Sequence, residues 1–117
     1  MAAVADRERL RKMMNGVSVK TLTAEQITDA IRSLLIRYHA EGAILFGSYA
    51  RQEADEISDI DVVIIGGAQF EPTDVFSLAE DLHRMTQKEV DVYEIREIDQ
   101  ESDFFRTILR EGVKIAA

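Results

Sequence analysis

The sequence predicts an α/β protein in which helices pack on a small mixed β-sheet. Segments whose apolar residues recur at helical spacing alternate along the chain with short runs of β-branched residues, which is typical of this layered arrangement. One proline, six glycines and no Ser/Gly/Pro-rich stretch leave no sign of a long linker. The 117 residues therefore indicate one domain with a single hydrophobic core.

The first predicted helix begins after Thr23, which can form a capping box with Gln26, and ends near Gly42. A buried strand is expected at residues 43–46, because this apolar run is short and flanked by glycines. A short helix is expected to follow at residues 49–54. The apolar residues of the first helix are Ile27, Ala30, Ile31, Leu34, Leu35 and Tyr38.

The β-branched run at residues 61–65 stops at Gly66 and Gly67 and predicts a strand that is covered on both faces. Thr73 is expected to cap the next helix. The alternating pattern at residues 90–95 then predicts a third strand. The apolar stripe of the helix between these strands consists of Val75, Leu78, Ala79, Leu82 and Met85.

The last helix is predicted between Ser102, as its cap, and Gly112, as its C-terminal stop. Residues 113–115 are expected to add an edge strand to the sheet. The side chains of this helix that are expected to face inward are Phe105, Ile108 and Leu109.

The N-terminal residues 1–20 stand apart, because they carry several Arg and Lys side chains and only Leu10, Met13 and Met14 cluster on a possible helical face. We expect a segment that is helical, frayed or folded only with a partner, followed by a domain at residues 21–117. Met13 and Met14 form a small apolar patch in this segment, which suggests an oligomer as one alternative.

The composition excludes several classes of function. Without cysteine, the chain has no disulfide, no thiolate metal site and no thiol nucleophile. Its apolar runs are far shorter than the roughly 20 residues of a membrane-spanning helix. Its charged N-terminus does not resemble a secretory signal, so a cytoplasmic protein is expected. Residues 52–103 hold 16 Asp and Glu against three Lys and Arg, which disfavours non-specific nucleic-acid binding.

Gly47 and Ser48 lie where the first strand gives way to the predicted short helix. Glycine allows the backbone to approach a ligand closely, and the serine hydroxyl and the free N–H groups of a helix N-terminus can bind a phosphate. A Gly-Ser pair at a strand end can equally be a simple turn. Tyr49, which follows, is expected to be exposed, and either stacks on a base or plays no role.

Asp59 and Asp61 lie at the start of the second strand, where residues two apart project to the same face. Two adjacent carboxylates repel each other, unless a cation compensates for their charge or one of them takes up a proton. Mg²⁺ is bound in proteins by one or two such carboxylates together with substrate phosphates. The alternative is a solvated turn that Ser58 caps.

Asp91 is a third candidate, because it interrupts the alternation of Val90 and Val92 and is expected to face the opposite side of the strand. If the second and third strands are neighbours, Asp91 converges with Asp59 and Asp61. Such a triad can hold two metal ions, of which one lowers the pKa of an attacking hydroxyl. The alternative is that Asp91 lies at a strand edge and faces solvent.

One stretch of the chain combines the run Gly47-Ser48-Tyr49-Ala50-Arg51 with, after six further residues, the run Ser58-Asp59-Ile60-Asp61. This stretch resembles the nucleotidyltransferase superfamily that includes DNA polymerase β, most closely its minimal members. The resemblance implies a nucleotidyltransferase-like fold for the domain. Minimal members often have glycine directly after the arginine, whereas this chain has Gln52. The site residues implied by the resemblance are Asp59, Asp61 and Asp91 for catalysis and metal binding, and Gly47, Ser48, Arg51 and Ser58 for the nucleotide.

The resemblance also implies a function. Minimal members resemble antitoxins that work with a helical HEPN-type partner protein, which implies Mg²⁺-dependent transfer of AMP from ATP to a tyrosine hydroxyl of that partner. Arg51 either reaches the phosphates or pairs with a nearby carboxylate. Two alternatives remain open: a non-catalytic binding module that neutralises its partner by forming a complex, and a small-molecule nucleotidyltransferase that acts as an oligomer.

Overall fold

The computed structural model of the chain describes residues 22–55 and 58–117. The expectations for residues 1–20, including the apolar patch of Met13 and Met14, lie outside the described residues. The elements are, in order, α2 (Ala24–Arg37), β1 (Gly42–Phe46), β2 (Ile60–Ile65), α3 (Asp74–Thr86), β3 (Val90–Glu94), the 3₁₀ turn η1 (Ile95–Glu97), α4 (Asp103–Glu111) and β4 (Val113–Ala116).

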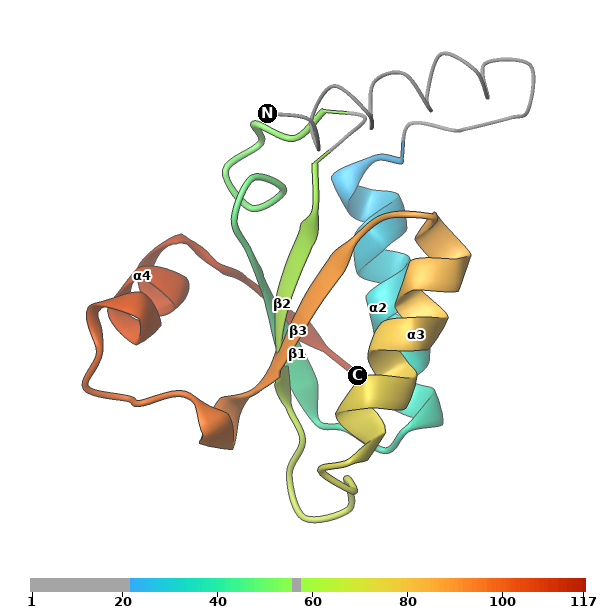
Figure 1. Cartoon of the computed structure of the whole chain (residues 1–117), viewed down its shortest axis with the longest axis vertical. Helices are drawn as coiled ribbons and strands as arrows, with labels where there is room; N and C mark the ends of the chain where they lie inside the picture. Colours follow the sequence, from blue (N-terminus) through green and yellow to red (C-terminus); the bar gives the residue numbers. More distant parts are fainter. Residues whose placement is uncertain (1–21, 56–57) are drawn as a thin grey trace, which may run out of the picture.

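The four strands form one mixed sheet in the order β3-β2-β1-β4 (Figure 1). β1 pairs antiparallel with both β2 and β4, whereas β2 pairs in parallel with β3. Parallel neighbours need a long crossover connection, and α3 supplies it here. The predicted α/β architecture is therefore confirmed, with β4 at one edge of the sheet as expected and β3 at the other.

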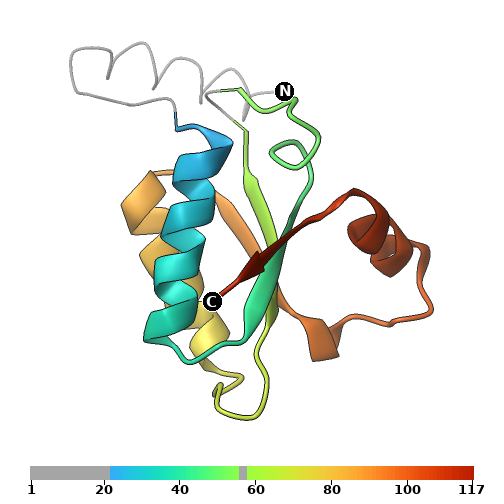
Figure 2. The same ribbon diagram turned by 180° about the vertical axis from the view of Figure 1, so that it is seen from behind.

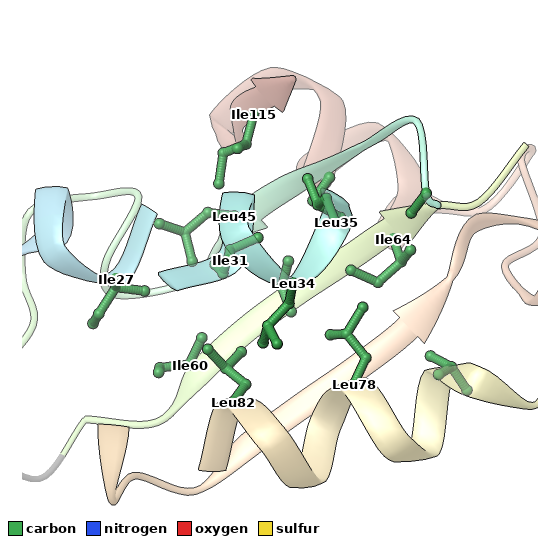
Figure 3. Close-up of a cluster of buried hydrophobic side chains, with 14 of the residues drawn as sticks. Ile27, Ile31, Leu34, Leu35, Leu45, Ile60, Ile64, Leu78, Leu82 and Ile115 are labelled. Carbon is green, nitrogen blue, oxygen red and sulfur yellow. The ribbon is translucent and has the colours of Figure 1, made fainter. Parts of the chain in front are cut away.

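Helices cover both faces of the sheet. α2 and α3 lie side by side on one face, and α4 lies on the other (Figures 1 and 2). Because alternate residues of a strand face opposite sides, Ile60, Val62 and Ile64 of β2 join the main core beneath α2 and α3 (Figure 3). Val63 instead packs against Ile108 of α4 in a second, smaller cluster. Asp61 shares this α4 face, and the site is built there.

Most of the expected helix signals are confirmed. Thr23 and Gln26 form the capping box of α2, and the Ser102 hydroxyl accepts a hydrogen bond from the backbone N–H of Phe105. Thr73 lies at the start of α3, but its side chain makes no capping hydrogen bond. α2 ends at Arg37, well before Gly42, which already belongs to β1.

Two residues that were expected to face the core are exposed. Met85 of α3 has 51% of its surface exposed and Leu109 of α4 has 49%. Helical spacing places each of them on the apolar face of its helix. The rest of the protein covers only part of that face, so these two side chains stay exposed. Both expectations are therefore wrong, whereas Phe105 and Ile108 are buried as predicted.

The short helix expected at residues 49–54 is absent, and hydrogen-bonded turns occupy its place. The N–H of Arg51 donates to the Gly47 carbonyl at 3.1 Å, and the N–H of Glu53 donates to the Ser48 carbonyl at 2.9 Å. Gly47 and Gln52 have φ of 73° and 59°, in the left-handed region that interrupts a right-handed helix. Contrary to the expectation, Ser48 does not lie at a helix N-terminus.

Tyr49 is buried, contrary to the sequence-based expectation. Only 4% of its surface is exposed, and its ring packs into the main core with the Lys88 ammonium 5.7 Å from the ring centroid. Its hydroxyl is a buried polar atom that has no hydrogen-bond partner among the described residues. The ring anchors the loop that follows β1.

Tyr49→Phe is expected to leave the free energy of unfolding unchanged or to raise it by about 1 kcal/mol, because it removes a buried group without a partner. Tyr49→Ala is expected to lower it by about 3–5 kcal/mol, because it leaves a cavity in the core. Urea denaturation of both variants measures these changes. A phenylalanine variant that is clearly less stable than the wild type would show that the hydroxyl has a favourable partner.

No helix in the described ranges combines the length and the apolar character that crossing a membrane requires.

Candidate active site

A pocket of about 410 Å³ opens on the α4 face of the sheet, between the loop after β1 and α4. The pairing of Phe46 with Asp61 across β1 and β2 explains why it forms there, since the loop and the first residues of β2 must then meet. The residues that line it are Phe46, Gly47, Ser48, Arg51, Asp59, Asp61, Phe104, Thr107 and Glu111. Five of the seven residues implied by the sequence therefore share one pocket.

Gly47 is required at its position for two reasons. Its φ of 73° lies in the left-handed region, where other residues are strained. A Cβ atom at this position would lie 2.3 Å from Oδ2 of Asp61. The loop backbone thus runs directly against the Asp61 carboxylate, whereas the close approach to a ligand that the sequence suggested stays a prediction.

Asp61 and Asp91 lie side by side, because they are register partners in the parallel pairing of β2 and β3. Burial raises the pKa of Asp61 to about 6, with further contributions from the charge of Asp91, a hydrogen bond to Asp91 and the charge of Asp59. Arg51 acts in the opposite direction. The crowding of three carboxylates that the sequence predicted is therefore present.

The metal-binding role stays a prediction. Among residues 22–55 and 58–117, no three His, Cys, Asp or Glu side chains are arranged to hold a metal ion together. The donor chemistry nevertheless fits a hard divalent cation, because Asp59 and Asp61 offer oxygen ligands in one pocket. The raised pKa of Asp61 also shows that the negative charge of this carboxylate is poorly compensated by its surroundings, which a bound cation would correct.

The pKa of Asp61 makes the stability of the metal-free protein depend on pH. The pKa is raised from 3.8 to about 6 on folding, so the folded protein binds more protons than the unfolded chain between these values. The stabilisation is complete below the unfolded pKa and is lost as the pH rises through the folded pKa. We expect the free energy of unfolding of the wild type, relative to Asp61→Asn, to fall between about pH 4 and pH 7. Urea denaturation across this range measures it, and a constant difference would contradict the assignment.

Arg51 connects the loop to α4. Its Nε lies 3.1 Å from a carboxylate oxygen of Glu53, and its Nη1 lies 3.8 Å from one of Glu111. These contacts agree with the alternative that Arg51 pairs with nearby carboxylates. Since Arg51 also lines the pocket, a phosphate that binds there would compete with both carboxylates for the guanidinium.

Ser58 and Asp91 do not line the pocket. The hydroxyl of Ser58 donates to Oδ1 of Asp55 at 3.1 Å and accepts from the Asp55 N–H at 2.9 Å. This is the turn-capping role that the sequence left open for Ser58. Asp91 is exposed on β3 beside Asp61.

Sequence reasoning missed the part of the pocket that α4 lines. Phe104, Thr107 and Glu111 of α4 line the pocket there, together with Phe46 at the end of β1. The only local signal was that residues 104, 107 and 111 are three and four positions apart, which places them on one face of a helix.

Gln52 stands in the left-handed region with φ of 59°, at the position where minimal nucleotidyltransferases often have glycine. Gln52→Gly is expected to raise the free energy of unfolding by up to about 1 kcal/mol, because it relieves this strain. Gln87→Gly is the matched control, since Gln87 has φ of 56° at the end of α3, away from the pocket. Thermal unfolding should show a similar gain for both variants, and a loss for Gln52→Gly alone would reveal a stabilising contact of its side chain.

Comparison with known proteins places these observations in context. Residues 29–117 match the model of the family described as polymerase beta, nucleotidyltransferase. A protein of Methanocaldococcus jannaschii, named as a candidate protein adenylyltransferase, is 35% identical over 71 residues, which cover 61% of this chain and 76% of that protein.

Solved structures also resemble the chain. A candidate minimal nucleotidyltransferase superposes with a TM-score of 0.65 and 25% identity, over 80% of this chain and 97% of that chain. A chain from the complex of the tri-AMPylated Shewanella oneidensis HEPN toxin with an MNT antitoxin superposes with a TM-score of 0.60 and 19% identity, over 79% of this chain and 71% of that chain. At 19% identity, the second likeness shows a shared fold.

Proposed function

The chain belongs to the polymerase beta nucleotidyltransferase family, and we propose that this nucleotidyltransferase transfers AMP from ATP to a tyrosine hydroxyl of a HEPN-type partner protein, as the antitoxin of a toxin-antitoxin pair. The family match and the similar minimal structure confirm the nucleotidyltransferase-like fold expected from the sequence. The name of the archaeal relative supports AMP as the transferred group. The AMPylated HEPN toxin in the similar complex supports the type of acceptor.

The observation that carries this proposal is the contact between the loop and the acidic residues. The absent Cβ of Gly47 leaves room for the Asp61 carboxylate, so a phosphate held by the loop would lie within reach of Asp59 and Asp61. The Ser48 hydroxyl and the Arg51 guanidinium line the same pocket and can bind and neutralise phosphate oxygens.

In the proposed reaction, the acceptor hydroxyl oxygen attacks the α-phosphorus of ATP, the bond to the pyrophosphate oxygen breaks, and pyrophosphate leaves. Asp59 and Asp61 would hold Mg²⁺, which supplies charge neutralisation and a lowered pKa for the hydroxyl. Asp91, which is exposed beside Asp61, would accept the hydroxyl proton. The protein contributes mainly the positioning of the two reactants.

The direct test incubates the purified protein with labelled ATP, Mg²⁺ and the product of the neighbouring gene, as the candidate HEPN-type partner. Label is expected on that partner, and it should disappear when the acceptor tyrosine is replaced by phenylalanine. Absence of label, together with an Asp59→Asn variant that protects cells as well as the wild type does, would exclude the enzyme.

Two observations favour a second candidate, the non-catalytic binding module. Burial and the charge of Asp91 raise the pKa of Asp61, which disfavours its charged form, and no three His, Cys, Asp or Glu side chains are arranged to hold a metal ion among the described residues. Calorimetry with ATP separates the two functions. The enzyme should release heat on binding ATP only when Mg²⁺ is present, whereas a binding module should show no heat that depends on the metal.

A further inference from the structure

Three aromatic rings meet on the α4 face, next to the pocket. Phe46 comes from β1, Tyr93 from β3 and Phe104 from α4. The ring centroid of Phe104 lies 5.6 Å from that of Phe46 and 5.8 Å from that of Tyr93, and both pairs meet edge to face. This is the favoured geometry for aromatic pairs, so two strands hold the Phe104 ring in a defined position.

These ring contacts nevertheless cover only part of the Phe104 side chain. It keeps 43% of its surface exposed and lines the pocket together with Phe46. Leu109 on the same helix is similarly exposed, at 49%, but does not line the pocket. The difference between the two residues is that the free surface of Phe104 borders a polar cavity that contains Ser48 and Asp61.

We infer that Phe104 stacks against the nucleobase of the bound nucleotide, while the loop of Gly47 and Ser48 holds its phosphates. This inference rests on the proposed function and adds a base-binding subsite to it. The loop and α4 both line one pocket, so a ligand whose phosphates are held at the loop can extend its other end along α4.

The side chains of α4 that line the pocket suit a base and a ribose. Every base has an aromatic face, and stacking on a fixed aromatic side chain favours binding without selecting one base. Thr107 lies one turn beyond Phe104 on the same face of α4 and offers a hydroxyl to the polar edge of the ligand. The subsite would therefore make the domain bind a nucleotide more tightly than its phosphates alone.

The experiment compares ATP with inorganic tripolyphosphate, which has no base. Calorimetry in Mg²⁺ measures the Kd of each for the wild type, for Phe104→Leu, which keeps the apolar bulk, and for Leu109→Ala as control. Phe104→Leu is expected to weaken ATP binding about tenfold or more and to leave tripolyphosphate binding unchanged. Leu109→Ala is expected to change neither.

Phe104→Trp gives an independent readout, because the chain has no tryptophan. ATP is expected to quench the emission of this single indole, and tripolyphosphate is not. Equal weakening of both ligands by Phe104→Leu would mean that the ring only shapes the pocket, and this overturns the inference. Unchanged ATP binding in that variant overturns it as well, while the proposed function stands. A wild type that binds neither ligand overturns both.

Discussion

Asp61→Asn is expected to lower the rate of nucleotidyl transfer by about 10³-fold or more, while the protein remains folded. Asparagine has nearly the shape of aspartate but no charge to hold a divalent cation or to stabilise the reacting groups. The stability of the fold should not suffer, because burial and the neighbouring carboxylates already disfavour the charged form of Asp61. Single-turnover transfer from labelled ATP measures the rate, and thermal unfolding measures the stability.

Asp29→Asn is the control for the loss of one negative charge. Asp29 is exposed on α2, where it pairs with Arg32, and it takes no part in the pocket. This variant is expected to keep the wild-type rate. If Asp61→Asn retained a rate within tenfold of the wild type, Asp61 would not be a catalytic residue and the proposed site would be wrong.

Gly47→Ala is expected to lower the transfer rate by about 10²-fold or more, because the added methyl group displaces either the loop or the Asp61 carboxylate. It should also lower the free energy of unfolding by about 1–3 kcal/mol, since alanine is strained at φ of 73°. The transfer rate and urea denaturation measure the two effects.

Gly67→Ala separates strain from the effect on the site. Gly67 has φ of 76°, almost that of Gly47, but a Cβ there would meet the side chain of Glu41, which is exposed and can move away. Gly67→Ala should therefore lose stability and keep its activity. Equal activity losses in the two variants would mean that general destabilisation, rather than the contact with Asp61, explains the effect.

The sequence was sufficient for features that depend on local periodicity. The alternation in β2 and β3 placed Asp61 and Asp91 on one face, and the parallel register brought the two residues together as expected. Helix beginnings at Thr23 and Ser102 were predictable because their capping partners lie three residues away.

The burial of individual side chains was not predictable where it depends on tertiary packing. Periodicity identifies the apolar side of α3 and α4, but it does not show where the opposing layer ends, so Met85 and Leu109 were wrongly placed inside. Tyr49 was wrongly placed outside, because its position follows from left-handed residues on both sides of it, at Gly47 and Gln52. Phe104 could not be assigned to the site, since its contact with Phe46 depends on how α4 crosses the sheet.

The position of β3 at the edge of the sheet has a consequence for the size of the acceptor. In the described part of the chain, no strand lies outside β3, and Asp91 is exposed on it. A tyrosine carried by a bulky protein could thus reach this carboxylate sideways, without entering the cavity that the nucleotide would fill. The nucleotide and the proposed acceptor tyrosine would then enter from different directions. The domain would need no conformational change to admit the acceptor.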